Sequence, residues 1–83
     1  SERVFAQLCT AFEGAFKGQE RIPLRGPVKE TNVDSLATKA GYVAAEDFNR
    51  SRLARRVKTT LHIEAKQIKE GKTPKWYWVR VVE

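Results

Sequence analysis

The stretch FNRSRLARRVKTTLHIEAKQIKEGKTPKWYWVRV, residues 48–81, decides the fold of this chain. Its first half has apolar residues spaced by four, four, four and three positions, the period of an amphipathic helix: Leu53, Val57, Leu61, Ala65 and Ile68. Phe48 lies off this stripe but fits as the residue before an Asn49 cap, where it would pack on Leu53. We therefore predict a helix over about residues 49–66.

The second half of the stretch predicts a β-hairpin. Residues 67–70 would form a short first strand, and the turn would be GKTP, residues 71–74, because Gly and Pro break regular structure. Residues 75–82 are rich in aromatic and β-branched side chains, which favour a second strand. In this strand Tyr77, Val79 and Val81 would share one face, whereas Trp76 and Trp78 would share the other.

Upstream of this stretch the sequence predicts two more helices. Residues 2–17 carry apolar side chains at helical spacing, and Gly18 would end this helix. Residues 18–30 contain Pro23 and Pro27 and predict a loop, with a brief strand near Pro23 or Val28.

A second helix would begin near Thr31 or Asn32. Thr31 and Asp34 have the spacing of a capping arrangement, and Gly41 would end the helix. The predicted order is helix, loop or strand, helix, helix and hairpin. This order makes a single α+β domain, mainly α, over residues 1–83.

The positive charge of the chain is concentrated in one segment. The whole chain has 16 Lys and Arg against 10 Asp and Glu. Residues 1–49 hold six basic and seven acidic residues, whereas residues 50–75 hold nine basic residues and only Glu64 and Glu70 as acids. A concentrated excess of this kind indicates a polyanionic partner rather than general solubility.

Composition and motifs argue against several other classes of protein. No apolar run has the length that a bilayer requires, and the single Cys9 forms no internal disulfide and suits a reducing, cytoplasmic compartment. His62 has no second ligand at metal spacing, so we expect no metal or other cofactor. The sequence has one His, one Cys and no clustered carboxylates, so it offers no combination of nucleophile and general base. We therefore expect no enzymatic activity from this domain alone. The chain contains no Met, and we expect it to be excised from a larger protein.

The predicted order resembles the winged helix-turn-helix family of DNA-binding domains. The residues that carry the resemblance are 33–41 for the supporting helix, 53–57 with Leu61 for the recognition helix, and 68–72 with 76–79 for the wing. One departure concerns the turn between the helices: the apolar position expected after Ala37 and Gly41 falls on Asp47, so the turn must be longer than usual. The chain also resembles terminal domains of plasmid, phage or mobile-element replication proteins.

The resemblance implies that the third helix enters the major groove of double-stranded DNA and that the hairpin is the wing. It also implies that the domain serves DNA replication, mobilisation or transcription control. Arg, Asn, Ser and Thr can all bond base edges, and Lys suits phosphate. The predicted DNA-binding residues are Asn49, Arg50, Ser51, Arg52, Arg55, Arg56, Lys58, Thr59, Lys66, Lys69, Lys72 and Lys75. Among these we expect Ser51, Arg52 and Arg55 or Arg56 to reach the bases.

Each of these assignments has a structural alternative. The basic helix face could simply be solvated, but a face of one charge sign repels itself, which favours a polyanion. The hairpin lysines could only protect an exposed edge from aggregation. Trp76 and Trp78 could stack on bases of single-stranded DNA or RNA, but packing is the favoured interpretation. In a second functional class, the domain would be a protein-protein interaction module whose Trp76 and Trp78 face contacts the parent protein or a second copy of the chain.

Overall fold

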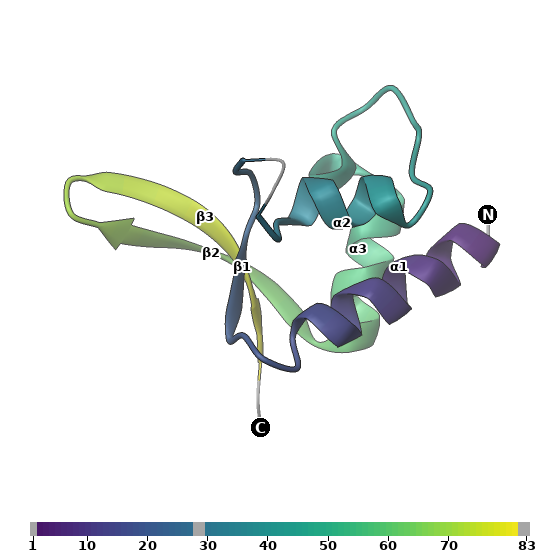
Figure 1. The fold of residues 1–83 in the computed structure, drawn as a ribbon, viewed down its shortest axis with the longest axis horizontal. Helices are drawn as coiled ribbons and strands as arrows, with labels where there is room; N and C mark the ends of the chain where they lie inside the picture. Colours follow the sequence, from purple (N-terminus) through teal and green to yellow (C-terminus); the bar gives the residue numbers. More distant parts are fainter. Residues whose placement is uncertain (1, 28–29, 82–83) are drawn as a thin grey trace.

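In the computed structural model, which describes residues 2–27 and 30–81, three α-helices stand at one end of a three-stranded antiparallel sheet (Figure 1). The elements in chain order are α1 (Glu2–Ala15), β1 (Arg21–Pro23), α2 (Val33–Lys39), the 3-10 helix η1 (Phe48–Arg50), α3 (Arg52–Leu61), β2 (Ile63–Glu70) and β3 (Thr73–Arg80). The α+β class predicted from the sequence is confirmed. None of the helices in the described part of the chain has the length and apolar character needed to cross a membrane.

The sheet has the strand order β1-β3-β2, so the short β1 and the long β2 flank β3. Ile22 and Ala65 both lie opposite Trp78, and Gln67 lies opposite Trp76. Directly opposite residues share a face, so these side chains all lie on one face of the sheet. The helices cover this face at the start of β2 and the end of β3, where Trp78 is buried. Figure 1 shows the turn of the β2–β3 hairpin extending well away from the helices.

One hydrophobic core lies between the helices and the root of the hairpin. Trp78 is fully buried at its centre, with the Phe12 ring centroid 4.8 Å and the Phe48 ring centroid 5.9 Å away. Phe48 also meets Tyr42 edge to face at 4.9 Å, which ties the long α2–α3 connection to the core. Aromatic pairs at these separations add to the stabilisation from burial alone. The packing of Trp78 predicted from the sequence is confirmed.

The third helix is shorter than predicted at both ends. It begins at Arg52, because the Ser51 side chain caps it by accepting a hydrogen bond from the Ala54 N–H, and Asn49 lies instead in η1. It ends at Leu61, because His62 takes a left-handed conformation with φ 57° and redirects the chain into β2. The prediction of helix over residues 49–66 was therefore wrong at residues 49–51 and 62–66.

The error at the end of the helix has a simple cause. A spacing of four residues returns to the same face of a helix and also to the same face of a strand. Ala65 therefore fits the helical pattern although it lies on β2. Lys66, the predicted last residue of the helix, also lies on β2. The hairpin is longer than predicted for the same reason, and its turn is confined to Gly71 and Lys72. Gly71 has φ 62°, the left-handed conformation that glycine adopts most easily.

The N-terminal predictions need smaller corrections. The first helix ends at Ala15 and not at Lys17, and the brief strand near Pro23 is confirmed as β1, whereas the alternative at Val28 lies outside the described residues. The second helix is capped by Asn32, whose side chain accepts from the Ser35 N–H while the Ser35 hydroxyl accepts from the Asn32 N–H. The predicted pair of Thr31 and Asp34 was thus one residue early.

Candidate nucleic-acid interface

The start of α3 carries the basic residues that the sequence singled out, and three of them point into solvent without an acidic partner. Arg50, Arg52 and Arg55 are exposed, and no carboxylate of the described residues lies within 4.0 Å of their guanidinium groups. The buried residues of α3, Ala54, Val57 and Leu61, hold the opposite side of the helix against the core. These contacts fix the direction in which the arginines point.

The charge at the start of α3 opposes what helix stability requires. A helix N-terminus carries a partial positive charge and is stabilised by acidic side chains. The first turn of α1 contains Glu2 and that of α2 contains Asp34, whereas the first turn of α3 contains no acid and begins with Arg52. The Ser51 side chain satisfies one backbone N–H of this turn, but the turn itself contains no acidic side chain. The arrangement is electrostatically unfavourable for the isolated domain and favourable for binding an anion.

Arg56 differs from its neighbour Arg55. Its guanidinium donates to both carboxylate oxygens of Glu2, at 3.0 and 3.4 Å, and lies 4.0 Å from the centre of the Phe5 ring. The hydrogen bond and charge of Arg56 lower the pKa of Glu2, whose side chain is exposed. Arg56 therefore joins α3 to α1, so of the two alternatives for base contact, Arg55 and Arg56, only Arg56 is already engaged with an acidic side chain of the described residues.

Two further predicted contact residues are engaged within the domain. Ser51 is buried, and its hydroxyl donates to the Phe48 carbonyl at 2.6 Å while it caps α3. Asn49 accepts a hydrogen bond from the Trp78 indole N–H at 2.9 Å. Its side-chain oxygen is thereby used to satisfy the buried tryptophan. Base contact by Ser51, as expected from the sequence, would require this cap to break.

Lys58 and Thr59 lie one turn further along α3. The Lys58 ammonium lies 5.6 Å from the Trp78 ring centroid, and partial burial, reinforced by the charge of Arg55, lowers the pKa of Lys58. Its stem thus covers the core while its charge remains at the edge of the arginine surface. Thr59 is exposed and projects on the same side as Arg52 and Arg55.

The lysines of the hairpin divide between the two faces of the sheet. Lys69 lies opposite Pro74, two positions beyond the Gln67–Trp76 pair, and so shares the face of Trp76. Lys66 and Lys75 lie on the other face with Tyr77. Lys72 is in the turn and is exposed. Lys69 therefore lies on the sheet face of Trp76, whereas Lys66 and Lys75 lie on the opposite face.

The face with Lys66 and Lys75 carries a self-contained polar cluster. The Tyr77 hydroxyl donates to Glu70 at 2.8 Å, which raises the pKa of Tyr77, and Arg21 bonds the same carboxylate at 2.7 Å. The Arg21 guanidinium also lies 4.6 Å from the Tyr77 ring centroid. This cluster neutralises its own charges, so it offers less to a polyanion than the helix side does.

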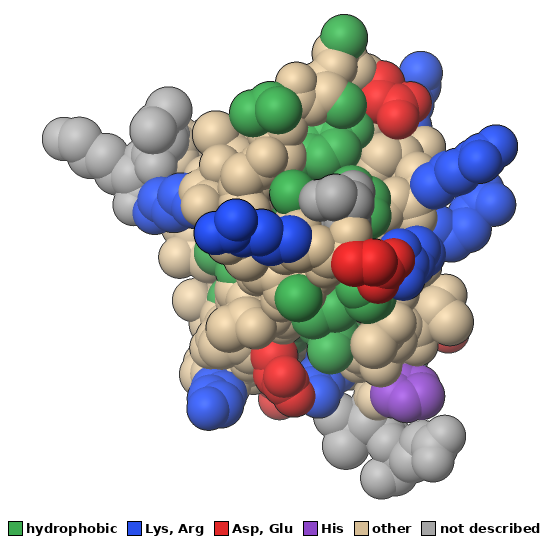
Figure 2. Space-filling model, turned by 90° about the vertical axis from the view of Figure 1, so that its right-hand side faces the viewer, with side chains coloured by type: hydrophobic (Ala, Val, Ile, Leu, Met, Phe, Trp, Pro, Cys, Tyr) green, Lys and Arg blue, Asp and Glu red, His purple; other side chains and the backbone are tan. Residues whose placement is uncertain are grey.

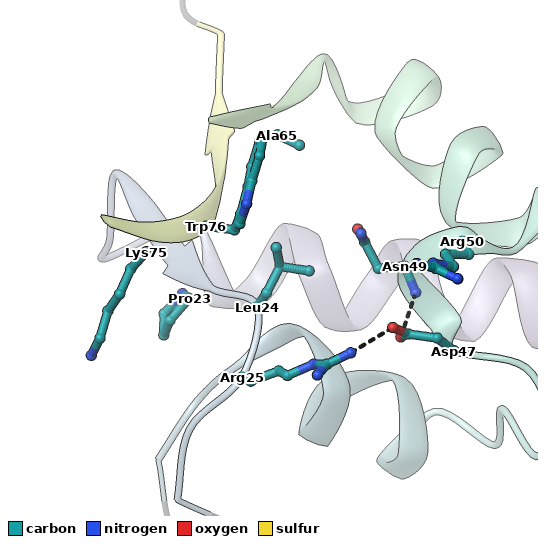
Figure 3. Close-up of a pocket in the computed structure, with 9 residues that line it drawn as sticks. All are labelled: Pro23, Leu24, Arg25, Asp47, Asn49, Arg50, Ala65, Lys75 and Trp76. Carbon is teal, nitrogen blue, oxygen red and sulfur yellow. Dashed lines mark hydrogen bonds and ion pairs between the residues drawn. The ribbon is translucent and has the colours of Figure 1, made fainter. Parts of the chain in front are cut away.

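A groove that the sequence did not predict lies between η1, which precedes α3, the end of β1 and the hairpin arm. Figure 3 shows its lining, and its volume is about 520 Å³. Trp76, Leu24, Pro23 and Ala65 supply apolar surface, while Arg25, Arg50, Lys75, Asp47 and Asn49 supply polar groups. Trp76 is 51% exposed, so packing does not account for it as it does for Trp78. No sequence signal joined these positions, because they come from five separate segments.

The surface view agrees with this charge distribution. Figure 2 shows several Lys and Arg side chains along the right-hand margin of the molecule, the side on which α3 lies behind α1 in Figure 1, and others on the left and lower parts of the same view. Within the described residues, no group of three His, Cys, Asp or Glu side chains could hold a metal ion. Cys9 is half-buried beside the core, and this burial raises the pKa of its thiol.

Comparison with known proteins gives no matching family model, no matching curated sequence and no matching solved structure. The functional argument for this chain therefore rests on its own residues and their arrangement.

Proposed function

We propose that this chain is a winged-helix domain that binds duplex DNA, with α3 in the major groove and the β2–β3 arm as the wing. The element order and the strand order β1-β3-β2 support this proposal, because they place a hairpin beside the last helix. Nine basic residues in the segment 50–75, which covers α3 and most of this hairpin, support the choice of partner. In this proposal the domain is a binding module and not an enzyme.

The observation that carries the proposal is the set of unpaired arginines at the start of α3. Arg52 stands against the helix dipole, and Arg50 and Arg55 flank it. Glu46 lines the same hollow, but no carboxylate of the described residues lies within 4.0 Å of the three guanidinium groups. A guanidinium can bond guanine through two parallel hydrogen bonds or bind phosphate through the same fork. Bound DNA would supply the negative charge that the protein lacks at this position.

The division of the hairpin lysines refines the interface. Lys69 and Lys72 lie where a wing would follow the DNA backbone, so we assign them to phosphate contacts. Lys66 and Lys75 lie on the other face of the sheet and contribute only to the long-range field. A protein-interaction surface formed by Trp76 and Trp78 together is less favoured, because Trp78 is fully buried and only Trp76 is exposed.

Fluorescence anisotropy with a labelled duplex of mixed sequence, measured over a series of salt concentrations, tests the proposal. The affinity of the wild-type domain should fall with salt at a slope of roughly −0.9 per phosphate contact. The double variant Arg52→Glu/Arg55→Glu should bind at least about a hundredfold more weakly at low salt, because it removes two cations and adds two anions at the interface.

The matched control is Lys17→Glu/Lys39→Glu, which makes the same change in net charge away from α3. It should lose much less affinity, because its charges act only at long range through screened solvent. Equal losses in the two double variants would reduce the interaction to net charge and would overturn the assignment to α3. Tight binding by Arg52→Glu/Arg55→Glu would overturn it as well.

A further inference from the structure

The groove between η1, the end of β1 and the hairpin arm has the features of a site for one unpaired nucleobase. It combines an exposed indole with a cationic rim. The indole of Trp76 is 51% exposed, and Leu24, Pro23 and Ala65 complete the apolar wall. An exposed aromatic ring is a platform on which any base can stack, and such stacking is insensitive to sequence.

The polar groups of the groove favour a nucleotide over a neutral or acidic peptide. Asp47 is the acidic residue of the lining, and its carboxylate already accepts from Arg25 at 2.7 Å and from the Asn49 N–H. Arg50 has no carboxylate partner among the described residues, whereas the Lys75 side chain points away from Trp76 (Figure 3). The remaining charge on the rim is therefore positive, which suits the phosphate attached to a stacked base.

Asn49 adds a donor for the base itself. Its side-chain oxygen is occupied by the Trp78 indole N–H, which holds the amide in place. Asn49 lines the groove, and no described residue accepts a hydrogen bond from its side-chain amide nitrogen. A base edge within the groove could provide this acceptor through a ring nitrogen or an exocyclic oxygen.

The groove is continuous with the proposed duplex interface. Arg50 lines it and also lines a neighbouring hollow formed with Arg52 and Arg55. A strand that leaves a duplex held at α3 would therefore reach Trp76 past Arg50. We propose that this domain binds duplex DNA next to a single-stranded extension and stacks the first unpaired base on Trp76. This inference rests on the proposed function and deepens it from duplex DNA to a duplex with a single-stranded branch.

Three probes with the same duplex test the inference: a blunt end, a short single-stranded tail, and the same tail with abasic sites. The wild-type domain should bind the tailed duplex about tenfold more tightly than the blunt one. The abasic tail keeps the phosphates but has no base to stack, so it should give little gain. Trp76→Leu should bind all three probes nearly equally, with the blunt-end affinity unchanged, and Trp76→Phe should keep part of the gain.

Tryptophan fluorescence gives a second readout. Stacking on a base should quench the emission of wild type with the tailed probe, and Trp76→Phe, which retains only the buried Trp78, should show little quenching. Equal affinity of wild type for the three probes would overturn the inference and leave the duplex proposal intact. The groove would then fit a protein partner better than a nucleobase. Trp76-dependent binding of the tailed probe without binding of the blunt duplex would overturn the duplex proposal and leave only the stacking of a base on Trp76. Failure to bind any probe would overturn both.

Discussion

Trp76 and Trp78 lie two residues apart on β3 and on the same face of the sheet, yet their surroundings are opposite. Trp78 is fully buried under the helices, whereas Trp76 is 51% exposed on the arm that extends past them. The alternation of a strand determines the face of a side chain but not whether another layer covers it. The root of the hairpin thus belongs to the core, and the arm is free to bind.

The same contrast separates two adjacent arginines of α3. Arg56 is joined to Glu2 and Phe5 of α1, while Arg55 has no acidic partner in the described part of the chain. Both arginines are exposed, but only Arg56 is engaged with an acidic side chain of the described residues. Four comparisons between variants test whether residues of the core and residues of the proposed interface behave differently.

The largest difference should separate the two tryptophans in stability. Trp78→Ala removes the centre of the aromatic core and should lower the free energy of unfolding by about 3–5 kcal/mol. Trp76→Ala should change it by no more than about 0.5 kcal/mol, because its ring is 51% exposed and lies outside the hydrophobic core. Urea denaturation followed by circular dichroism measures both. A similar loss for the two variants would show that the arm is part of the core.

The two arginines should differ next, in binding rather than in stability. Arg55→Gln should weaken duplex binding by about tenfold, because a guanidinium contact is lost. Arg56→Gln should change the affinity much less and should lower the melting temperature slightly, because it breaks the link to α1. Anisotropy and thermal melting on both variants test this. Weaker binding by Arg56→Gln than by Arg55→Gln would reverse the assignment.

The hairpin lysines should differ mainly in the salt dependence of binding. Lys69→Gln/Lys72→Gln should reduce the slope of log affinity against log salt by about 2, since two phosphate contacts are lost. Lys66→Gln/Lys75→Gln, on the other face, should reduce it by less than half as much. The two double variants carry the same net charge, so a common decrease would mean that the face of the sheet is irrelevant.

The smallest expected effect is a pH dependence of stability through Glu2. The pKa of Glu2 is lowered in the folded state, so its ion pair with Arg56 stabilises the fold above the unfolded pKa. This contribution should disappear as pH falls through the lowered pKa of the folded state. Glu2→Gln should remove the dependence in melting experiments between neutral and acidic pH. An unchanged profile would show that the pair contributes nothing measurable.

Much of the fold could be predicted from sequence because its signals are local. The apolar stripe of α1, the Gly71 turn and the aromatic strand β3 each follow from spacing within one segment. The end of α3 could not be predicted in this way, because a four-residue spacing fits helix and strand alike, and the left-handed conformation of His62 has no distinctive sequence signal.

Less of the site than of the fold could be predicted from the sequence. The basic character of α3 was evident from its residues, and Arg50, Arg52 and Arg55 do lie together at its start. The engagement of Arg56 with Glu2 joins positions 54 residues apart, so it required the fold. The burial of Ser51 and the bond between Asn49 and Trp78 depend on tertiary packing in the same way. The groove around Trp76 was unforeseen because its walls come from distant segments.

The most direct test of the proposed interface is a titration of the isotope-labelled domain with a short duplex, followed by amide and arginine side-chain chemical shifts. The account predicts that the largest changes fall on residues 50–59, on Lys69 and on Lys72, with little change on α2 or at Lys66. Changes centred instead on α1, α2 or the Tyr77 face of the hairpin would contradict it.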